Sequence, residues 1–318
     1  MTISEITKTV EEAHGRIKEH ILKTPLIKSF ALSDLINGSV YLKLENEQYT
    51  GSFKARGSLN KLMAIGDTDQ EVITASTGNH GLGFARAVGL TGLKGTVFLP
   101  HSAAKTKVKK IGRHPVKIAR HGDDPLTTEL HAKNYAQEND AIWVSPYNDY
   151  QVIAGQGTIG KEILDQLDHV DDILVTMGGG GLISGIGAYI KTHSPDTSII
   201  GCEPRHSPEM TLSLRAGMIV DDPDAKDTLS DGSAGGIEPG AITFPICQKV
   251  VDHCVLVEEE EIATGIKMMI TEHGKIIEGS AAVTIASLLK EKKRYEHRTV
   301  VLVICGGNID INILKQLL

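Results

Sequence analysis

Four consecutive glycines, Gly178-Gly179-Gly180-Gly181, follow the apolar run Ile173–Met177 and precede Leu182-Ile183-Ser184-Gly185. An apolar run of this length that stops at a glycine turn is typical of a buried strand. Consecutive glycines let the backbone wrap a small anion, because several N–H groups then converge on it as in a nest. The stretch therefore predicts a phosphate-binding turn at the end of a strand.

The same alternation of apolar runs and helix-period segments continues along the chain. Candidate strands are Val40–Leu44, Val72–Ala75, Gly95–Leu99, Val116–Ala119, Ala141–Val144, Ile173–Met177, Ser198–Gly201 and Thr299–Ile304. Candidate helices include Gly81–Gly89, Gln156–Leu167, Glu259–His273 and Ala281–Lys290. Strands rich in Val and Ile that alternate with helices indicate parallel βαβ units with both sheet faces covered. We therefore predict an α/β fold.

Two stretches with turn chemistry divide the 318 residues. One is Ser145–Tyr150, which reads Ser-Pro-Tyr-Asn-Asp-Tyr, and the other is Glu45–Gly51. If the chain crosses between domains at both, residues 1–48 and 149–318 form a large domain and residues 49–148 a small inserted one. Two domains also agree with the chain length.

Charge and composition exclude several classes of protein. The net charge of -7 argues against a nucleic-acid-binding protein, because no basic face is implied. The four cysteines form no CxxC pair and fit neither a zinc site nor a disulfide framework. The N-terminal segment is polar, and no run of about 18 apolar residues could span a membrane. We therefore expect a cytoplasmic protein without a membrane or nucleic-acid partner.

Two further glycine turns follow candidate strands. Ser76-Thr77-Gly78-Asn79-His80-Gly81 offers hydroxyls, an amide and backbone N–H groups to an anion such as a carboxylate, although the same residues are favoured as a simple helix cap. Cys305-Gly306-Gly307-Asn308 ends the last strand and would point Cys305 into the same crevice, although a small buried cysteine at a tight turn is common.

The glycine loop does not by itself identify the molecule whose phosphate it would bind. A dinucleotide-binding fold also places glycines after a strand, with an acidic residue about 20 residues further on. Glu203 stands in about that position. An NAD-binding oxidoreductase is therefore a rival interpretation of the tetraglycine loop.

Lys54 lies in the run Gly51-Ser52-Phe53-Lys54-Ala55-Arg56-Gly57, where a helix is expected to start after a turn. A lysine buried against apolar neighbours is shifted toward its neutral, nucleophilic form. A solvated surface lysine is the alternative for any single lysine. The combination of Lys54 with the three glycine turns is what favours a reactive amine.

The four elements occur in the order, and roughly the spacing, of one known family. The chain resembles the fold-type II pyridoxal-phosphate enzymes, in the branch of the threonine/serine dehydratases and serine racemase. The likeness runs from Thr24-Pro25-Leu26 to Asp310 and includes Ala154-Gly155-Gln156-Gly157-Thr158, Asp231-Gly232 and Glu278-Gly279. It implies a two-domain fold of the tryptophan synthase β type, with mostly parallel open sheets and helices on both faces.

The resemblance implies roles for individual residues. Lys54 would hold pyridoxal 5'-phosphate as a Schiff base and then act as the base on Cα, while Phe53 packs near the ring and Asn79 bonds the ring's 3-hydroxyl. The cofactor phosphate would be bound by Gly178, Gly179, Gly180, Gly181 and Leu182. Cys305 would face the pyridine nitrogen. The substrate carboxylate would be taken by Ser76, Thr77, Asn79 and His80, and the segment that starts at Asp231 would shape the side-chain pocket.

The family also implies a metal and an assembly. Serine racemase and some dehydratases bind Mg²⁺ or Ca²⁺ through a glutamate, a backbone carbonyl and a second acidic residue, which match Glu203, Ser207 and Glu209 here. Oxygen ligands suit such cations, although two glutamates on a loop are more often solvated. Relatives are usually homo-oligomers, so a homodimer is expected.

The reaction expected from the resemblance is α,β-elimination from a β-hydroxy L-amino acid, which gives a 2-oxo acid and ammonia. A neutral Cys305 at the ring nitrogen gives a weak electron sink, which favours prompt loss of the β-hydroxyl. Thr77 stands where racemases have serine, and Thr128 stands where serine racemase has arginine. Both departures favour a dehydratase over a racemase, which is kept as the alternative.

The substrate itself is left open by the sequence. The segments Ser145–Asp149 and Gly235–Gly240 are similar to those of hydroxyectoine-utilisation dehydratases, which would make a larger hydroxy amino acid the substrate. A non-catalytic binding protein that kept the fold is a further rival, since folds do not fix functions. The intact Lys54, Asn79 and glycine loop favour a lyase over that rival.

Overall fold

The computed structural model describes residues 1–318, and its ten strands form two separate sheets. The larger sheet has the order β1-β2-β10-β7-β8-β9, in which only β1 is antiparallel to its neighbour. Its strands are β1 (Leu26–Ser29), β2 (Ser39–Leu44), β10 (Thr299–Ile304), β7 (Asp172–Thr176), β8 (Ser198–Pro204) and β9 (His253–Val257).

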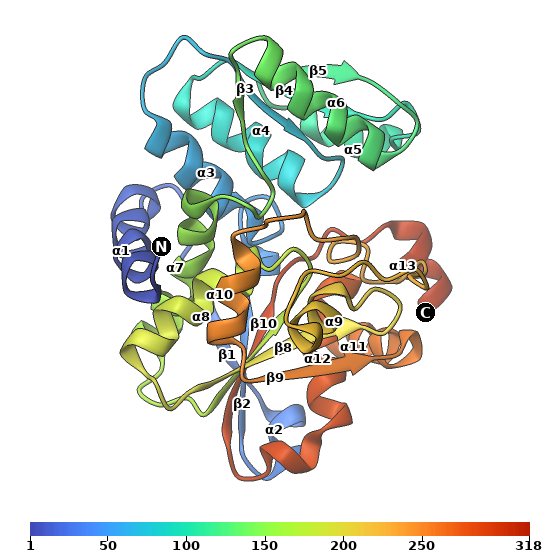
Figure 1. The fold of residues 1–318 in the computed structure, drawn as a ribbon. Coiled ribbons are helices and arrows are strands. Elements are labelled where there is room, and N and C mark those ends of the chain that lie inside the picture. Colours follow the sequence, from blue (N-terminus) through green and yellow to red (C-terminus); the bar gives the residue numbers. More distant parts are fainter.

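The smaller sheet has the order β5-β4-β3-β6 and is entirely parallel. Its strands are β5 (Lys117–Arg120), β4 (Gly95–Leu99), β3 (Val72–Ala75) and β6 (Ile142–Trp143). Figure 1 shows this sheet, with α4, α5 and α6, in one half of the molecule and the larger sheet in the other. The prediction of an α/β fold with mostly parallel open sheets is confirmed.

Helices connect and cover these strands (Figure 1). They are α1 (Ile3–Ile17), α2 (Phe30–Ile36), α3 (Lys54–Ile65), α4 (Asn79–Thr91), α5 (Lys105–Ile111), α6 (Pro125–Glu138), α7 (Tyr150–Gln166), α8 (Gly181–His193), α9 (Glu209–Ala216), α10 (Thr243–Val250), α11 (Glu259–His273), α12 (Gly279–Lys290) and α13 (Ile311–Leu317), with 3-10 turns at Glu45–Glu47 and Lys292–Tyr295. None of these helices is both long and apolar enough to cross a bilayer.

The eight predicted strands are all present, with ends shifted by up to three residues. The sequence did not indicate β1 and β9, which form the two edges of the larger sheet. Edge strands are short and half-exposed, so they lack the continuous apolar run that marks a central strand. β1 carries the exposed Lys28, and β9 begins with His253.

Helix α7 begins at Tyr150, six residues before the predicted Gln156. Asp149 caps it, because its side chain accepts hydrogen bonds from the backbone N–H groups of Gln151 and Val152. Its buried glycines hide the helical pattern in the sequence but allow close packing. A Cβ on Gly155 would lie 2.6 Å from the Cα of Gly57 on α3, so both positions must stay small.

The four strands of the smaller sheet lie within residues 49–148, and the six strands of the larger sheet lie outside them. Helix α3 also lies within 49–148, but it packs on α7 as well as on α4. The domain boundaries at 48/49 and 148/149 therefore stay a prediction, with α3 at the junction between the two sheets.

Strands β2, β10 and β7 are neighbours in the larger sheet and parallel to one another. Their carboxyl ends therefore meet at one edge, which is where ligands bind in open α/β sheets. Lys54 follows β2, Cys305 follows β10 and the four glycines follow β7. The sheet order thus brings three predicted site elements together, although more than 120 residues separate each from the next.

Candidate active site

The loop that carries Lys54 is fixed against the loop after β10. Phe53 N–H donates to the carbonyl of Cys305 at 3.0 Å, and Gly307 N–H donates to the carbonyl of Gly51 at 2.9 Å. Ser52 and Gly306 form an isolated antiparallel bridge between the same loops. These backbone bonds hold the first residue of α3, Lys54, next to Cys305.

The Lys54 amine takes part in no ion pair. Its Nζ donates to the carbonyl oxygen of Pro146 at 2.7 Å and lies 5.1 Å from the centre of the Phe53 ring. Burial lowers its pKa to about 8, because removal from water disfavours the ammonium form, while the negative charge of Glu278 opposes that shift. Lys54 is therefore an amine that is poised to lose its proton near neutral pH.

The tetraglycine loop presents a row of unpaired donors. None of the backbone N–H groups of Gly178, Gly179, Gly180 and Gly181 donates to another group of the chain, and α8 begins at Gly181. Gly180 has a φ of +84°, a left-handed conformation that favours glycine. Free N–H groups at the N-terminus of a helix form a ready binding site for a phosphate.

Two residues that the sequence did not indicate cover this loop. A Cβ on Gly179 would lie 2.5 Å from the ring of Tyr147, and a Cβ on Gly178 would lie 2.5 Å from the carbonyl oxygen of Ser233. The Tyr147 hydroxyl accepts a hydrogen bond from Glu238 N–H at 2.9 Å. Tyr147 belongs to a segment noted for its turn chemistry, and Ser233 belongs to a segment noted through the family resemblance, but only the fold shows that they touch the glycine loop.

Cys305 is buried at the end of β10, with 3% of its surface exposed. Burial raises the pKa of its thiol well above the ordinary value, so the group stays neutral at neutral pH. Phe53 is partly buried in the adjoining loop and packs against the core that contains Cys305. A neutral thiol beside Lys54 agrees with the predicted arrangement.

Asn79, at the start of α4, reaches the larger sheet through its side chain. Its Nδ2 donates to Glu278 Oε1 at 2.8 Å, and its Oδ1 accepts from Asn308 Nδ2 at 2.8 Å. Glu278 and Asn308 were not among the predicted site residues, although both lie in motifs that the sequence had singled out. Asn79 is thus joined to the ends of two loops that adjoin Lys54 and Cys305.

The comparisons with known proteins agree with this geometry. The family model described as pyridoxal-phosphate dependent enzyme matches residues 17–306. This chain belongs to that family.

An L-threonine ammonia-lyase from Geobacter sulfurreducens is 40% identical over 96% of this chain and 76% of its own. A threonine deaminase isoform from Solanum lycopersicum is 31% identical with a TM-score of 0.93, covering 99% of this chain and 87% of that one. A serine racemase from Dictyostelium discoideum is 31% identical with a TM-score of 0.88, covering 96% of this chain and 99% of that one. The predicted family is confirmed.

The free N–H groups and the free amine of this pyridoxal-phosphate enzyme suit the groups of its cofactor. The unpaired N–H groups of Gly178 to Gly181 suit the phosphate, and the Lys54 amine, free of any carboxylate partner, suits the aldehyde carbon. Asn79 keeps one amide hydrogen beyond its bond to Glu278. The individual contacts assigned to Lys54, Phe53, Asn79, Leu182 and Cys305 stay predictions, and their positions are consistent with them.

The loop after β3 has the free donors that a substrate carboxylate needs. Helix α4 begins at Asn79, so the N–H groups of its first turn have no partner within the helix. The Ser76 hydroxyl accepts from Gly78 N–H at 3.2 Å, while the Thr77 hydroxyl forms no hydrogen bond within the chain. Ser76, Thr77 and Asn79 therefore remain candidates for substrate contact.

The ring of His80 turns away from the loop that is predicted to bind the substrate carboxylate. The ring is buried, with Nε2 3.1 Å from the carbonyl of Val144 and Nδ1 3.4 Å from the Ser58 hydroxyl. A carbonyl oxygen can only accept, so Nε2 carries the proton. The ring therefore belongs to the packing between α3, α4 and β6. A contact of His80 with the substrate stays a prediction, and it would be made by the backbone N–H.

The buried ring of His80 should make the protein sensitive to acid. Burial lowers its pKa to about 3, so folding excludes the protonated form that the unfolded chain adopts below its ordinary value of 6.5. The contribution of the neutral ring to the free energy of unfolding is therefore fully present above pH 6.5. It decreases as the pH falls, and the loss is about 2 kcal/mol at pH 5.

We expect the His80→Gln variant to show a smaller decrease in the free energy of unfolding between pH 6.5 and pH 5 than the wild type. Chemical denaturation at the two pH values measures this difference. Equal decreases in both proteins would contradict the assignment of the buried neutral ring.

Asp231 is exposed, whereas Thr128 is buried in the first turn of α6. The Asp231 side chain is 68% exposed, and its carboxylate is 3.9 Å from Lys107 Nζ on α5. The Thr128 hydroxyl donates to the backbone carbonyls of His121 at 2.8 Å and Asp124 at 2.7 Å. The contact of Asp231 with the substrate stays a prediction, whereas the Thr128 hydroxyl stabilises the first turn of α6.

The predicted metal ligands are buried and already hydrogen-bonded. Glu203 accepts from the backbone N–H groups of Met210 at 3.1 Å and Thr211 at 2.7 Å, which begin α9. The Glu209 carboxylate accepts from the Ser207 hydroxyl at 2.7 Å. No group of three or more His, Cys, Asp or Glu side chains is placed to hold a metal ion. A cation here remains a prediction.

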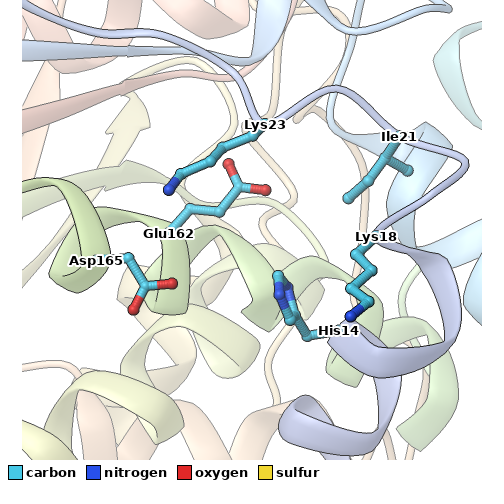
Figure 2. A pocket seen from close by; sticks show the side chains of 6 residues that line it. All are labelled: His14, Lys18, Ile21, Lys23, Glu162 and Asp165. Atoms are coloured by element: carbon cyan, nitrogen blue, oxygen red, sulfur yellow. The ribbon is translucent and has the colours of Figure 1, made fainter.

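A cavity of about 230 Å³ lies apart from these residues, beside α1 and α7 (Figure 2). It is lined by His14, Lys18, Ile21, Lys23, Glu162 and Asp165. Behind it, Glu162 joins a buried ionic cluster, in which Arg56 pairs with Glu45 at 2.8 Å and with Glu162 at 2.6 Å, and Lys43 pairs with Glu162 at 2.6 Å. Arg56 lies two residues after Lys54, so the cluster fixes the first turn of α3 to β2 and α7.

Proposed function

We propose that this enzyme removes water and then ammonia from a β-hydroxy L-amino acid of the threonine and serine type, giving a 2-oxo acid. The observation that carries the proposal is the Lys54 amine, partly buried, without a carboxylate partner and with its pKa lowered to about 8. The relative named L-threonine ammonia-lyase, 40% identical over 96% of the chain, supports the same reaction.

When bound, pyridoxal phosphate supplies the electron sink for the bond that breaks at Cα. The N–H groups of Gly178 to Gly181 would hold its phosphate, and the Lys54 amine would hold it covalently. The Lys54 amine is also the base that would remove the Cα proton of the substrate, which it can do near neutral pH because its pKa is lowered to about 8.

Other residues of the chain orient the substrate and favour elimination. The first-turn N–H groups of α4, with Ser76 and Thr77, would bind the substrate carboxylate and so orient Cα toward Lys54. The Cys305 thiol stays neutral, so it would supply no negative charge to stabilise a protonated ring nitrogen. A weak sink favours loss of the β-hydroxyl as soon as the proton leaves Cα, so elimination is preferred to transamination.

The experiment is an assay of 2-oxo-acid and ammonia release with L-threonine, L-serine, hydroxyaspartate, phenylserine and hydroxyectoine-derived amino acids. We expect the highest kcat/KM with L-threonine or L-serine. If the cofactor-loaded protein releases no 2-oxo acid or ammonia from any of these substrates, the proposal is refuted. Preference for a larger substrate would support the variant in which Tyr147, Asn148 and Glu238, which contact one another, shape a wider pocket.

Racemisation is the second candidate activity. The Thr77 hydroxyl is free of partners within the chain, and the fold matches that of a serine racemase with a TM-score of 0.88. Chiral analysis of serine recovered from the same reactions tests it. We expect D-serine to form more slowly than pyruvate, because the methyl group of threonine restricts the hydroxyl that would return a proton to Cα.

We extend the proposal to a Mg²⁺ or Ca²⁺ ion at Glu203, the Ser207 carbonyl and Glu209. These are oxygen ligands of the kind that such cations prefer. Glu203 Oε2 accepts from both the N–H and the hydroxyl of Thr211, but Glu203 Oε1 accepts only from Met210 N–H, and only one oxygen of Glu209 accepts a hydrogen bond, so each carboxylate keeps a lone pair for a cation. At ten times its Kd, a cation should add about 1.4 kcal/mol to the free energy of unfolding.

Thermal denaturation tests this prediction. After EDTA treatment, millimolar Mg²⁺ or Ca²⁺ should raise Tm by about 2 °C or more relative to NaCl of equal ionic strength. The increase should be absent in Glu209→Gln. An equal Tm in all three salts would refute the cation site.

A cytoplasmic homodimer completes the proposal. Sedimentation equilibrium measures the mass of the assembly, and the mass of a single chain would refute the dimer.

A further inference from the structure

Glu278 is a buried carboxylate at the point where the two halves of the molecule meet. It is 5% exposed and forms the N-cap of α12. Its Oε1 accepts from the side chain of Asn79, and its Oε2 accepts from the backbone N–H of Asn308 at 2.9 Å. Both partners are donors, so the carboxylate form satisfies them and a protonated form would not.

The orientation of the Asn79 amide is determined by this network. The Thr50 carbonyl can only accept, so Asn308 must direct its Nδ2 toward it, at 2.8 Å. The same Nδ2 donates to Asn79 Oδ1, and Asn79 Nδ2 in turn donates a hydrogen bond to the Glu278 carboxylate. A flipped Asn79 amide would place its oxygen against the Glu278 carboxylate and its nitrogen against the Asn308 amide group.

The backbone around Glu278 is built to admit the carboxylate. A Cβ on Gly306 would overlap with the Glu278 carboxylate, so any other residue at this position of the loop after β10 would displace that carboxylate. Glu278 N–H also donates to the carbonyl of Gly306 at 3.1 Å. The side chain is therefore held by contacts on its backbone, on both oxygens and along its length.

The charges around Glu278 are few. It forms no ion pair, and the charged or titratable groups that face it are Lys54, Lys107, Asp231 and Cys305. Burial raises its pKa to about 7, while the hydrogen bonds from Asn79 and Asn308 oppose that shift. The N-terminus of α12 favours its negative charge, which in turn favours the ammonium form of Lys54.

We propose that Glu278 is a positioning residue of the cofactor site, which fixes the amide of Asn79 and supplies the negative charge that faces Lys54. The inference rests on the proposed function only in that Asn79 and Lys54 are taken to contact the cofactor. It assigns to Glu278 two separable effects, one that depends on its hydrogen bonds and one that depends on its charge.

Two substitutions separate these effects. Glu278→Gln removes the charge and places an NH₂ group against one of two donors, whereas Glu278→Asp keeps the charge but shortens the side chain by one methylene. The first measurement is the Kd of the cofactor-free protein for pyridoxal phosphate. We expect it to rise about tenfold or more in both variants, because a misplaced Asn79 loses a hydrogen bond within the site.

The second measurement needs no cofactor. It is the rate at which an amine-reactive reagent modifies Lys54 at pH 7, followed by mass spectrometry of the peptide that contains it. Loss of the neighbouring negative charge lowers the pKa of Lys54 and raises the neutral fraction. We expect the rate to rise about threefold or more in Glu278→Gln and to stay at the wild-type value in Glu278→Asp.

The control is Asp172→Asn. Asp172 is another buried carboxylate, but it lies at the opposite end of β7 and pairs with Arg298. This variant should lose stability while keeping the wild-type Kd and the wild-type rate at Lys54. If Glu278→Gln does not fold, Glu278→Asp still tests the hydrogen-bonding role through Kd.

The outcomes distinguish the inference from the function on which it rests. An unchanged Kd in both Glu278 variants would refute the positioning role, and an unchanged rate in Glu278→Gln would refute the effect of the charge. Failure of the wild-type protein to bind pyridoxal phosphate at all would instead refute the proposed function.

Discussion

Replacement of Lys54 with alanine is expected to lower kcat by about 10⁴-fold or more, because it removes the general base on Cα and the covalent attachment of the cofactor together. The variant should still bind pyridoxal phosphate through the glycine loop, but without a covalent bond. Assays of 2-oxo-acid release measure the first effect. Borohydride reduction followed by mass spectrometry measures the second, since only a cofactor attached to an amine is trapped.

A matched control is available on the same helix. Lys61 lies two turns after Lys54 and pairs with Asp149 at 2.6 Å in a partly exposed position. Lys61→Ala should change stability by about 1 kcal/mol or less and leave kcat within about twofold. Trapping of the cofactor in Lys54→Ala, or comparable losses of activity in the two variants, would contradict the role of Lys54.

Alanine at Gly178 is expected to weaken the binding of pyridoxal phosphate by about 100-fold or more. Its Cβ would lie 2.5 Å from the carbonyl oxygen of Ser233, a backbone atom that cannot move aside as a flexible side chain would. The loop must then shift, and hydrogen bonds to a charged phosphate contribute about 1.5–3 kcal/mol each. Loss of two such bonds corresponds to the expected effect.

The Kd of the cofactor-free protein, measured by absorbance titration, checks this expectation. Gly179→Ala should be less severe, because the ring of Tyr147 that its Cβ would meet is a side chain. The control is Gly15→Ala in α1, where the same methyl group would meet no atom within 4 Å. That substitution should stabilise the protein by up to about 1 kcal/mol and leave Kd unchanged. A wild-type Kd in Gly178→Ala would show that the phosphate is bound elsewhere.

The central strands were predictable because they are buried on both faces. Val300 to Ile304 of β10 are wholly buried, so the strand reads as an uninterrupted apolar run. Edge strands β1 and β9 have no such run, and the buried glycines of α7 conceal the helix around them. Prediction from hydrophobic periodicity fails where the residue type is set by contact with another helix or strand, because such a residue interrupts the periodic pattern.

The candidate site shows the same division. Lys54 and the four glycines were candidates from the sequence because a nucleophile and a phosphate loop need particular residue types in a short span, and Asn79 was a candidate through the family resemblance. Glu278 and Tyr147 lay in motifs whose purpose only the fold reveals, through contacts with Asn79 and Gly179. His80 stood in the correct loop, but its ring turns into the core toward Ser58 and Val144.

The sequence by itself determined the family and singled out Lys54 and the glycine loop as candidates for the reactive amine and the phosphate site, since these depend on local backbone chemistry and on the order of motifs along the chain. The tertiary structure alone decided which side chains meet, since the order β2-β10-β7 places Lys54, Cys305 and the glycine loop at one edge of a sheet. It also decided the charge state of the site. Burial lowers the pKa of Lys54 to about 8 and raises that of Glu278 to about 7. The burial of a single polar side chain depends on the elements that pack around it and not on its neighbours in the sequence.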